Sequence, residues 1–95
     1  IHPAPGHSAG LQYVRLMTRR GWVVVASDVA HYYEHIESER PFTTALHIGE
    51  MLEGYRKLRR MGEKGDHVVP GHDPLGMKKH PTAGPGLEGI VARLD

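Results

Sequence analysis

The chain has 95 residues, enough for one domain at most, and its 39% hydrophobic and 24% charged residues are typical of a soluble globular protein. A net charge of +1 gives no electrostatic reason to expect binding to nucleic acid or to an anionic membrane surface. Because cysteine is absent, disulfides and thiolate metal sites are excluded, and any metal ion must bind to His, Asp or Glu.

The first predicted elements form a hairpin. Residues 2–10, HPAPGHSAG, are rich in Pro and Gly and predict an ordered loop. Residues 11–18 alternate between apolar and polar and predict a strand. After a turn at 19–21, the β-branched residues of 22–27 predict a buried strand that ends at Asp28.

A long helix is predicted in the middle of the chain. Residues 28–41 are polar and mixed, with room for one helical turn. Between residues 43 and 61, apolar side chains recur mostly at steps of three and four, which predicts an amphipathic helix. Thr43 or Thr44 is a suitable N-cap, and Gly62 is a suitable C-terminal stop.

The remaining residues predict short elements. Residues 67–69, HVV, predict a short buried strand that leads into a tight turn at 70–74. Residues 78–89 are rich in Gly and Pro and predict a loop, and residues 90–94, IVARL, predict a last short strand.

Residues 31–35, HYYEH, match the pattern His-x-x-Glu-His of a class of zinc proteases. In that class His31 and His35 would bind zinc from one regular helix, and Glu34 would act as the general base. Here the pattern follows a buried strand by three residues and stops near Pro41, so we favour a chance match.

A different set of residues shares one structural context. His7 precedes a predicted strand, whereas Asp28 and His72 follow predicted strands, and Pro-Gly-His occurs twice, at 5–7 and 70–72. Strand ends and their loops are frequent places for chemistry. Two imidazoles and one carboxylate suit Zn, Fe, Mn or Co, and a carboxylate can bridge two ions. We therefore expect His7, Asp28 and His72 to converge on a metal site.

In this order, PGHSAG, the strand end ASD and VPGHDP resemble the C-terminal half of a metallo-β-lactamase-fold hydrolase. The segment ERPFTTALHIGEMLEGYRKLRRMG resembles the N-acyl homoserine lactonases, which are quorum-quenching enzymes. The resemblance covers residues 2–80. It implies an α/β (α+β) fold in which residues 1–95 are the C-terminal part of one αββα sandwich, with the N-terminal half absent. Because the chain enters IHPAPGH directly at Ile1, we also expect it to be part of a longer protein.

The resemblance implies a site of two divalent metal ions, zinc first and Fe, Co or Mn as alternatives. His7 and His72 would each complete the shell of one ion, and Asp28 would bridge the two. A metal-bridging hydroxide would open the lactone ring. In the family, a His-x-His-x-Asp-His motif supplies four further ligands, and these 95 residues lack that motif. We therefore expect the isolated fragment to be inactive.

One position departs from the family. The lactonases usually carry a substrate-contacting tyrosine three residues after the bridging aspartate, whereas this chain has His31 there, followed by Tyr32 and Tyr33. Tyr32 is favoured for that catalytic and substrate-binding role, His31 is the alternative, and Tyr33 is expected to pack against the following helix. Phe42 is a candidate for lining an acyl pocket.

The expected function of the parent protein is that of a metal-dependent hydrolase, most simply an N-acyl homoserine lactonase. Alternatives are another hydrolase of the same fold, acting on a thioester, a β-lactam or a phosphodiester, and an inactive structural half-domain that binds no metal alone. We expect a small-molecule partner, an acyl lactone or related ester, and neither nucleic acid nor membrane; a homodimer stays open. With no signal-peptide pattern and no long apolar run, a cytoplasmic location is expected.

Overall fold

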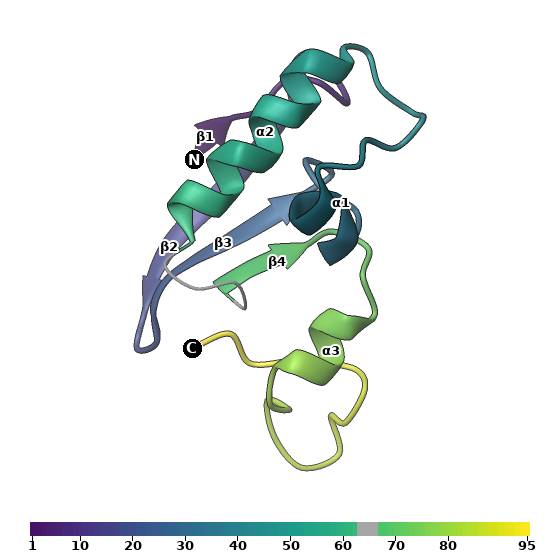
Figure 1. The fold of residues 1–95 in the computed structure, drawn as a ribbon. Helices are drawn as coiled ribbons and strands as arrows, with labels where there is room; N and C mark the ends of the chain where they lie inside the picture. Colours follow the sequence, from purple (N-terminus) through teal and green to yellow (C-terminus); the bar gives the residue numbers. More distant parts are fainter. Residues whose placement is uncertain (63–66) are drawn as a thin grey trace.

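The computed structural model describes residues 1–62 and 67–95. They form one small sheet with helices packed around it (Figure 1). In chain order the elements are β1 (His2–Pro3), β2 (Gln12–Thr18), β3 (Gly21–Ser27), α1 (Tyr33–Ser38), α2 (Ile48–Met61), β4 (Val68–Pro70) and α3 (Leu75–Lys79).

The predicted hairpin is confirmed. Strands β2 and β3 pair antiparallel, with Val14 opposite Val25 and Thr18 opposite Gly21. Gly21 has a φ of +103°, which glycine adopts without steric cost, so it suits the tight turn between the strands. The Thr18 hydroxyl donates to the Gly21 carbonyl oxygen at 2.9 Å and closes the turn.

The sheet has the strand order β1-β2-β3-β4. The predicted strand at 67–69 is confirmed as β4, shifted by one residue, and it runs parallel to β3. Because parallel strands end at the same edge of a sheet, the residues that follow β3 and β4 lie next to each other. That edge carries Asp28 and His72, one after each strand.

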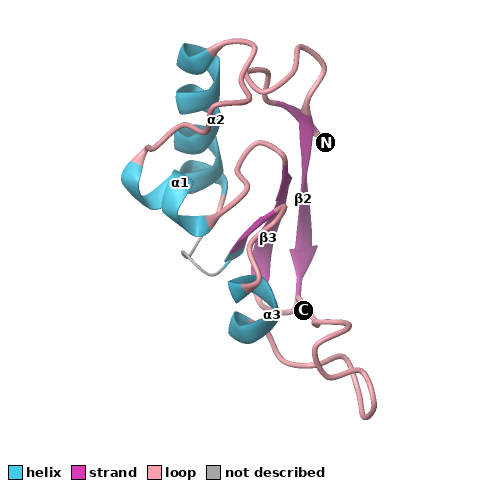
Figure 2. Cartoon of the chain, turned by 90° about the vertical axis from the view of Figure 1, so that its right-hand side faces the viewer, coloured by secondary structure: helices cyan, strands magenta, loops and turns pink. Residues whose placement is uncertain are grey.

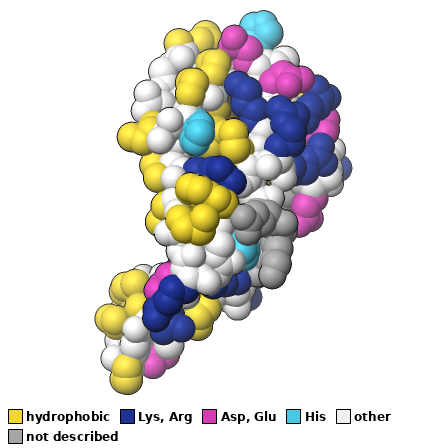
Figure 3. All heavy atoms as spheres, turned by 90° about the vertical axis from the view of Figure 1, so that its left-hand side faces the viewer, with side chains coloured by type: hydrophobic (Ala, Val, Ile, Leu, Met, Phe, Trp, Pro, Cys, Tyr) yellow, Lys and Arg dark blue, Asp and Glu magenta, His cyan; other side chains and the backbone are white. Residues whose placement is uncertain are grey.

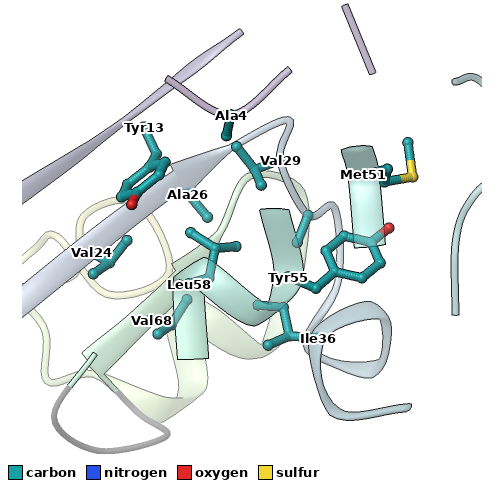
Figure 4. Close-up of a cluster of buried hydrophobic side chains, with 11 residues drawn as sticks. Ala4, Tyr13, Val24, Ala26, Val29, Ile36, Met51, Tyr55, Leu58 and Val68 are labelled. Carbon is teal, nitrogen blue, oxygen red and sulfur yellow. The ribbon is translucent and has the colours of Figure 1, made fainter. Parts of the chain in front are cut away.

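Helix α2 covers one face of the sheet, as its sequence pattern predicts. Figure 2 shows α1 and α2 on the same side of the strands. Met51, Tyr55 and Leu58 of α2 are buried, and Figure 4 shows Leu58 directed toward Val24 and Val68 of the sheet. These side chains belong to a single apolar core that joins the helix to β3 and β4.

The predicted start of this helix is wrong. Thr43 and Thr44 lie in the preceding loop, and the N-cap is His47, whose Nδ1 accepts a hydrogen bond from the Glu50 amide at 3.1 Å. The predicted stop is confirmed, because Gly62 is the C-cap and its N–H donates to the Leu58 carbonyl oxygen.

Three short elements differ from the sequence expectation. Residues 90–94 form no strand, and only the bridge between Thr82 and Ala92 pairs this part of the tail. Strand β1 was not predicted, because a two-residue strand is defined only by its pairing with β2. Helix α3 was not predicted either, because its five residues include no buried side chain and so give no amphipathic pattern. The single helical turn allowed within 28–41 is present as α1.

Part of the sheet surface is apolar. Figure 3 shows hydrophobic side chains gathered on the surface beside clusters of Lys and Arg side chains. Exposed apolar side chains of the hairpin are Val14, Leu16, Met17 and Val25. Within residues 1–62 and 67–95, no helix has the length and apolar character needed to cross a membrane.

Candidate metal centre

Two backbone hydrogen bonds join the loop after β3 to the loop after β4. The Gly71 amide donates to the Ala30 carbonyl oxygen, and the His72 amide donates to the His31 carbonyl oxygen, both at 3.0 Å. A Cβ atom at Gly71 would lie 2.6 Å from the Ser27 carbonyl oxygen, so only glycine allows this approach. The two loops are therefore held side by side by their backbones.

This pairing of loops brings three metal-ligand side chains together. Asp28, His31 and His72 each offer one ligand atom, and these atoms lie within 4.8 Å of one another. The Asp28 Oδ1 is 2.8 Å from His72 Nε2 and 3.8 Å from His31 Nε2. The side chain of His72 is 56% exposed and that of Asp28 40%, so solvent and small molecules can reach the group.

The ring of His31 is fixed by its neighbours. It stacks on Phe42 with centroids 3.9 Å apart and 16° between the ring planes. Burial lowers the pKa of His31, and the nearby His72 lowers it further, whereas Asp28 opposes the shift. The lowered pKa favours the neutral imidazole, which has the lone pair that a metal ion needs.

His7 lies beside this group rather than within it. Its ring centroid is 5.8 Å from that of His31 and 5.5 Å from that of Phe42. Its Nδ1 is 2.6 Å from the Thr44 carbonyl oxygen, which can only accept, so Nδ1 carries a proton and Nε2 is the nitrogen that could bind a metal ion. The structure thus brings Asp28 and His72 into direct contact. His7 is outside the group of three ligands, with its ring next to that of His31.

The segment HYYEH does not form one helix. His31 precedes α1, which begins at Tyr33, so the two imidazoles do not share a helical face as the protease pattern requires. Glu34 is paired with Arg40 at 2.5 Å instead of lying beside both histidines as a base. Burial lowers the pKa of His35, whose Nδ1 lies 3.4 Å from the Tyr32 amide.

The two tyrosines of this segment have different environments. Tyr32 is 45% exposed, and its ring is 6.4 Å from the His31 ring in an edge-on arrangement. Tyr33 is buried, and Lys79 lies over its ring at 3.8 Å from the centroid. Tyr32 is therefore the tyrosine of this pair that a bound molecule can reach.

Sequence reasoning missed Asp73, which orders the segments on both sides of the site. Its Oδ2 accepts from the Tyr33 amide and its Oδ1 from the Leu75 amide, each at 2.9 Å. One carboxylate thereby ties the start of α1 to the start of α3 and fixes the turn that carries His72. The bond to the Leu75 amide, two residues on, is an Asx-turn, for which Asp before Pro in HDPL is a local sequence signal.

The donor set fits a divalent transition metal. One carboxylate oxygen and two imidazole nitrogens suit Zn, Fe, Mn or Co better than Mg or Ca, which prefer oxygen ligands. The three donors come from two loops whose backbones are hydrogen-bonded to each other.

No protein-family model and no curated protein matches this sequence, but several solved structures do. An N-acyl homoserine lactone hydrolase with the product N-hexanoyl-L-homoserine bound at its catalytic metal centre is 28% identical, with a TM-score of 0.69 over 82% of this chain and 32% of that chain. A quorum-quenching N-acyl homoserine lactone hydrolase is 29% identical, with a TM-score of 0.63 over 74% of this chain and 29% of that chain.

A mutant of AiiA from B. thuringiensis, with N-decanoyl-L-homoserine bound at the active site, is 28% identical, with a TM-score of 0.69 over 82% of this chain and 32% of that chain. This chain thus spans about a third of the length of these structures. The resemblance carried by PGHSAG, ASD and VPGHDP is confirmed, as is the mixed α+β fold class. In its fold, this chain corresponds to part of an N-acyl homoserine lactonase of the metallo-β-lactamase superfamily.

Proposed function

We propose that this chain is the C-terminal part of a metal-dependent hydrolase that opens the ring of N-acyl homoserine lactones. The main support is the contact between Asp28 and His72 at the ends of two parallel strands, in a fold shared with lactonases. A similar structure has a lactone-derived product at its catalytic metal centre, which favours the same substrate class here.

The proposal assigns metal binding to His7, Asp28 and His72, with the remaining ligands supplied by the rest of the parent protein. Two divalent ions, zinc first, would polarise the lactone carbonyl and lower the pKa of a water molecule. The hydrogen bond of His7 supports its assignment as a ligand, because Thr44 engages Nδ1 and leaves Nε2 as the nitrogen that could bind an ion.

The substrate side of the site is assigned to Tyr32 and Phe42. Tyr32 is exposed next to His31, so its hydroxyl can donate a hydrogen bond to a lactone or acyl oxygen. Phe42 is half-buried against His7 and His31, and its outer edge is apolar, as an acyl chain requires. Together these side chains would orient the lactone and exclude water from one side of it.

The test is hydrolysis by the metal-loaded parent protein. We expect acyl homoserine lactones to be better substrates than thioesters, β-lactams or phosphodiesters. The Asp28→Asn variant should lose activity by about 100-fold or more, because the amide cannot replace a metal-binding carboxylate. His2→Gln is the control, since His2 lies in β1 and stacks on Tyr13 of β2, outside the group of three ligands. Full activity of Asp28→Asn, or a preference for another substrate class, would make the proposal wrong.

A further inference from the structure

We propose that Asp28, His31 and His72 form a divalent transition-metal site that belongs to this chain alone and binds one ion without the rest of the parent protein. This inference rests on the proposed function for one point only, the expectation that a metal ion binds at this edge of the sheet. It adds His31 as a ligand at the position where the resembling lactonases carry a tyrosine. One alternative left open by the sequence was a structural half-domain that binds no metal alone. We predict instead that the chain alone binds an ion.

The first support is the distance between the donors. The ligand atoms of all three side chains already lie within 4.8 Å of one another, and His31 Nε2 faces the same Asp28 Oδ1 that contacts His72. Ligand atoms around one zinc ion, each about 2.0–2.2 Å from it, are separated by about 3–4 Å. Small side-chain rotations therefore suffice to bind an ion.

The second support is the rigidity of the surroundings. The loops that carry His31 and His72 are hydrogen-bonded to each other through their backbones. The His31 ring is stacked on Phe42, and the Asp73 carboxylate fixes the turn after His72. A site whose ligands are held by such contacts loses little conformational entropy on binding.

The third support is the different environment of His7. Its side chain is outside the group of three ligands, and its ring centroid is 5.8 Å from that of His31. Its Nδ1 is engaged by the Thr44 carbonyl oxygen. The first ion to bind this chain is therefore expected to depend more on His31 than on His7, whereas the ligand set implied by the family resemblance has His7 and not His31.

The experiment titrates the 95-residue chain with Zn²⁺ by calorimetry and with Co²⁺ by visible absorption, which reports the coordinating atoms. We expect one ion per chain, bound about tenfold or more weakly by His31→Gln and by His72→Gln, with an altered Co²⁺ spectrum in each case. The control His2→Gln should bind like the original chain, and His7→Gln should weaken binding less than His31→Gln does. Circular dichroism of each variant shows whether its fold is retained.

Three results would overturn the inference. The first is that the chain binds no Zn²⁺ or does not fold. The second is that His31→Gln leaves the metal affinity and the Co²⁺ spectrum unchanged. The third is that His7→Gln lowers the metal affinity more than His31→Gln does. None of them bears on lactone hydrolysis by the parent protein, which is measured separately with Asp28→Asn. An inactive parent protein would refute the proposed function and leave the measured ion site in place.

Discussion

At the residue scale, the two Pro-Gly-His segments use glycine for the same physical reason. A Cβ atom at Gly6 would lie 2.5 Å from the Met51 amide nitrogen, and one at Gly71 would lie 2.6 Å from the Ser27 carbonyl oxygen. In both places the chain before a histidine lies against another segment's backbone, which cannot move aside as a flexible side chain would. Each histidine is thereby placed by packing of the main chain.

Substituting Gly71 tests this requirement. We expect Gly71→Ala to lower the free energy of unfolding by about 1–3 kcal/mol, because the methyl group forces the loops after β3 and β4 apart. Urea unfolding followed by circular dichroism measures the loss. Gly84→Ala is the control, since nothing lies within 4 Å of a Cβ there. Equal stability of the two variants would show that the close approach at Gly71 is unimportant.

The ionisation of Tyr55 makes the free energy of unfolding depend on pH in the alkaline range. Burial raises the pKa of Tyr55 to about 12, and the Phe42 backbone opposes the shift. The folded state therefore holds this proton more tightly than the unfolded state, whose tyrosine pKa is about 10. The stabilisation is complete below pH 10 and is lost as the pH rises from 10 toward 12, by about 2–3 kcal/mol in total.

Unfolding by urea at pH 9, 10, 11 and 12 measures this loss. Tyr55→Phe removes the ionisable group, so its stability should fall less over this range than that of the original chain. Tyr32→Phe is the comparison variant, because it removes an exposed hydroxyl and should keep the original decline. Parallel profiles for the original chain and Tyr55→Phe would contradict the role given to Tyr55.

At the scale of elements, the start of α2 can be located by capping. The side chain of His47 accepts the Glu50 amide, which is one of the donors left unpaired at a helix start. His47→Ala should therefore cost about 0.5–2 kcal/mol of stability. Thr43→Ala, at a cap position suggested by the sequence, should cost nothing measurable. Thermal or urea unfolding of both variants decides between the two starts, and a larger loss for Thr43→Ala would favour the longer helix.

The elements predicted from sequence are those whose signal is local. The alternation in 11–18, the β-branched run in 22–27 and the helical spacing that includes Tyr55 and Leu58 are each complete within one segment. The pairing of β1 depends on contacts with a strand that lies further along the chain, so composition near His2 does not predict it.

The candidate site likewise has residues that the sequence predicts and contacts that it does not. Asp28 and His72 were identifiable because each follows a predicted strand, and parallel pairing then brings them into contact. The stacking of Phe42 on His31 and the hydrogen bond from the Tyr33 amide to Asp73 depend on loop conformations that no sequence period specifies. From the sequence, His31 is only a residue that stands where the lactonases have a tyrosine. The structure adds that its ligand atom lies close to those of Asp28 and His72.

At the scale of the whole molecule, the hairpin exposes an apolar face. Residues opposite each other in an antiparallel pair share a face, as do residues two apart in one strand. Val14 and Leu16 of β2 therefore share a face with Val25 of β3, and all three are exposed. The matched lactonases are about three times longer than this chain, and in the longer protein proposed above further polypeptide would cover this face.

This exposed face predicts self-association of the isolated chain. Contiguous exposed apolar surface promotes association, so we expect the sedimentation coefficient to rise with protein concentration and a hydrophobic dye to bind. The double substitution Val14→Lys and Leu16→Lys should reduce both, because charge on the face opposes stacking of two sheets. Ile90→Lys is the control, since Ile90 is 72% exposed but lies in the tail, outside the sheet. A chain that stays monomeric and binds no dye, or an equal effect of the Ile90 variant, would show that the hairpin face does not drive association.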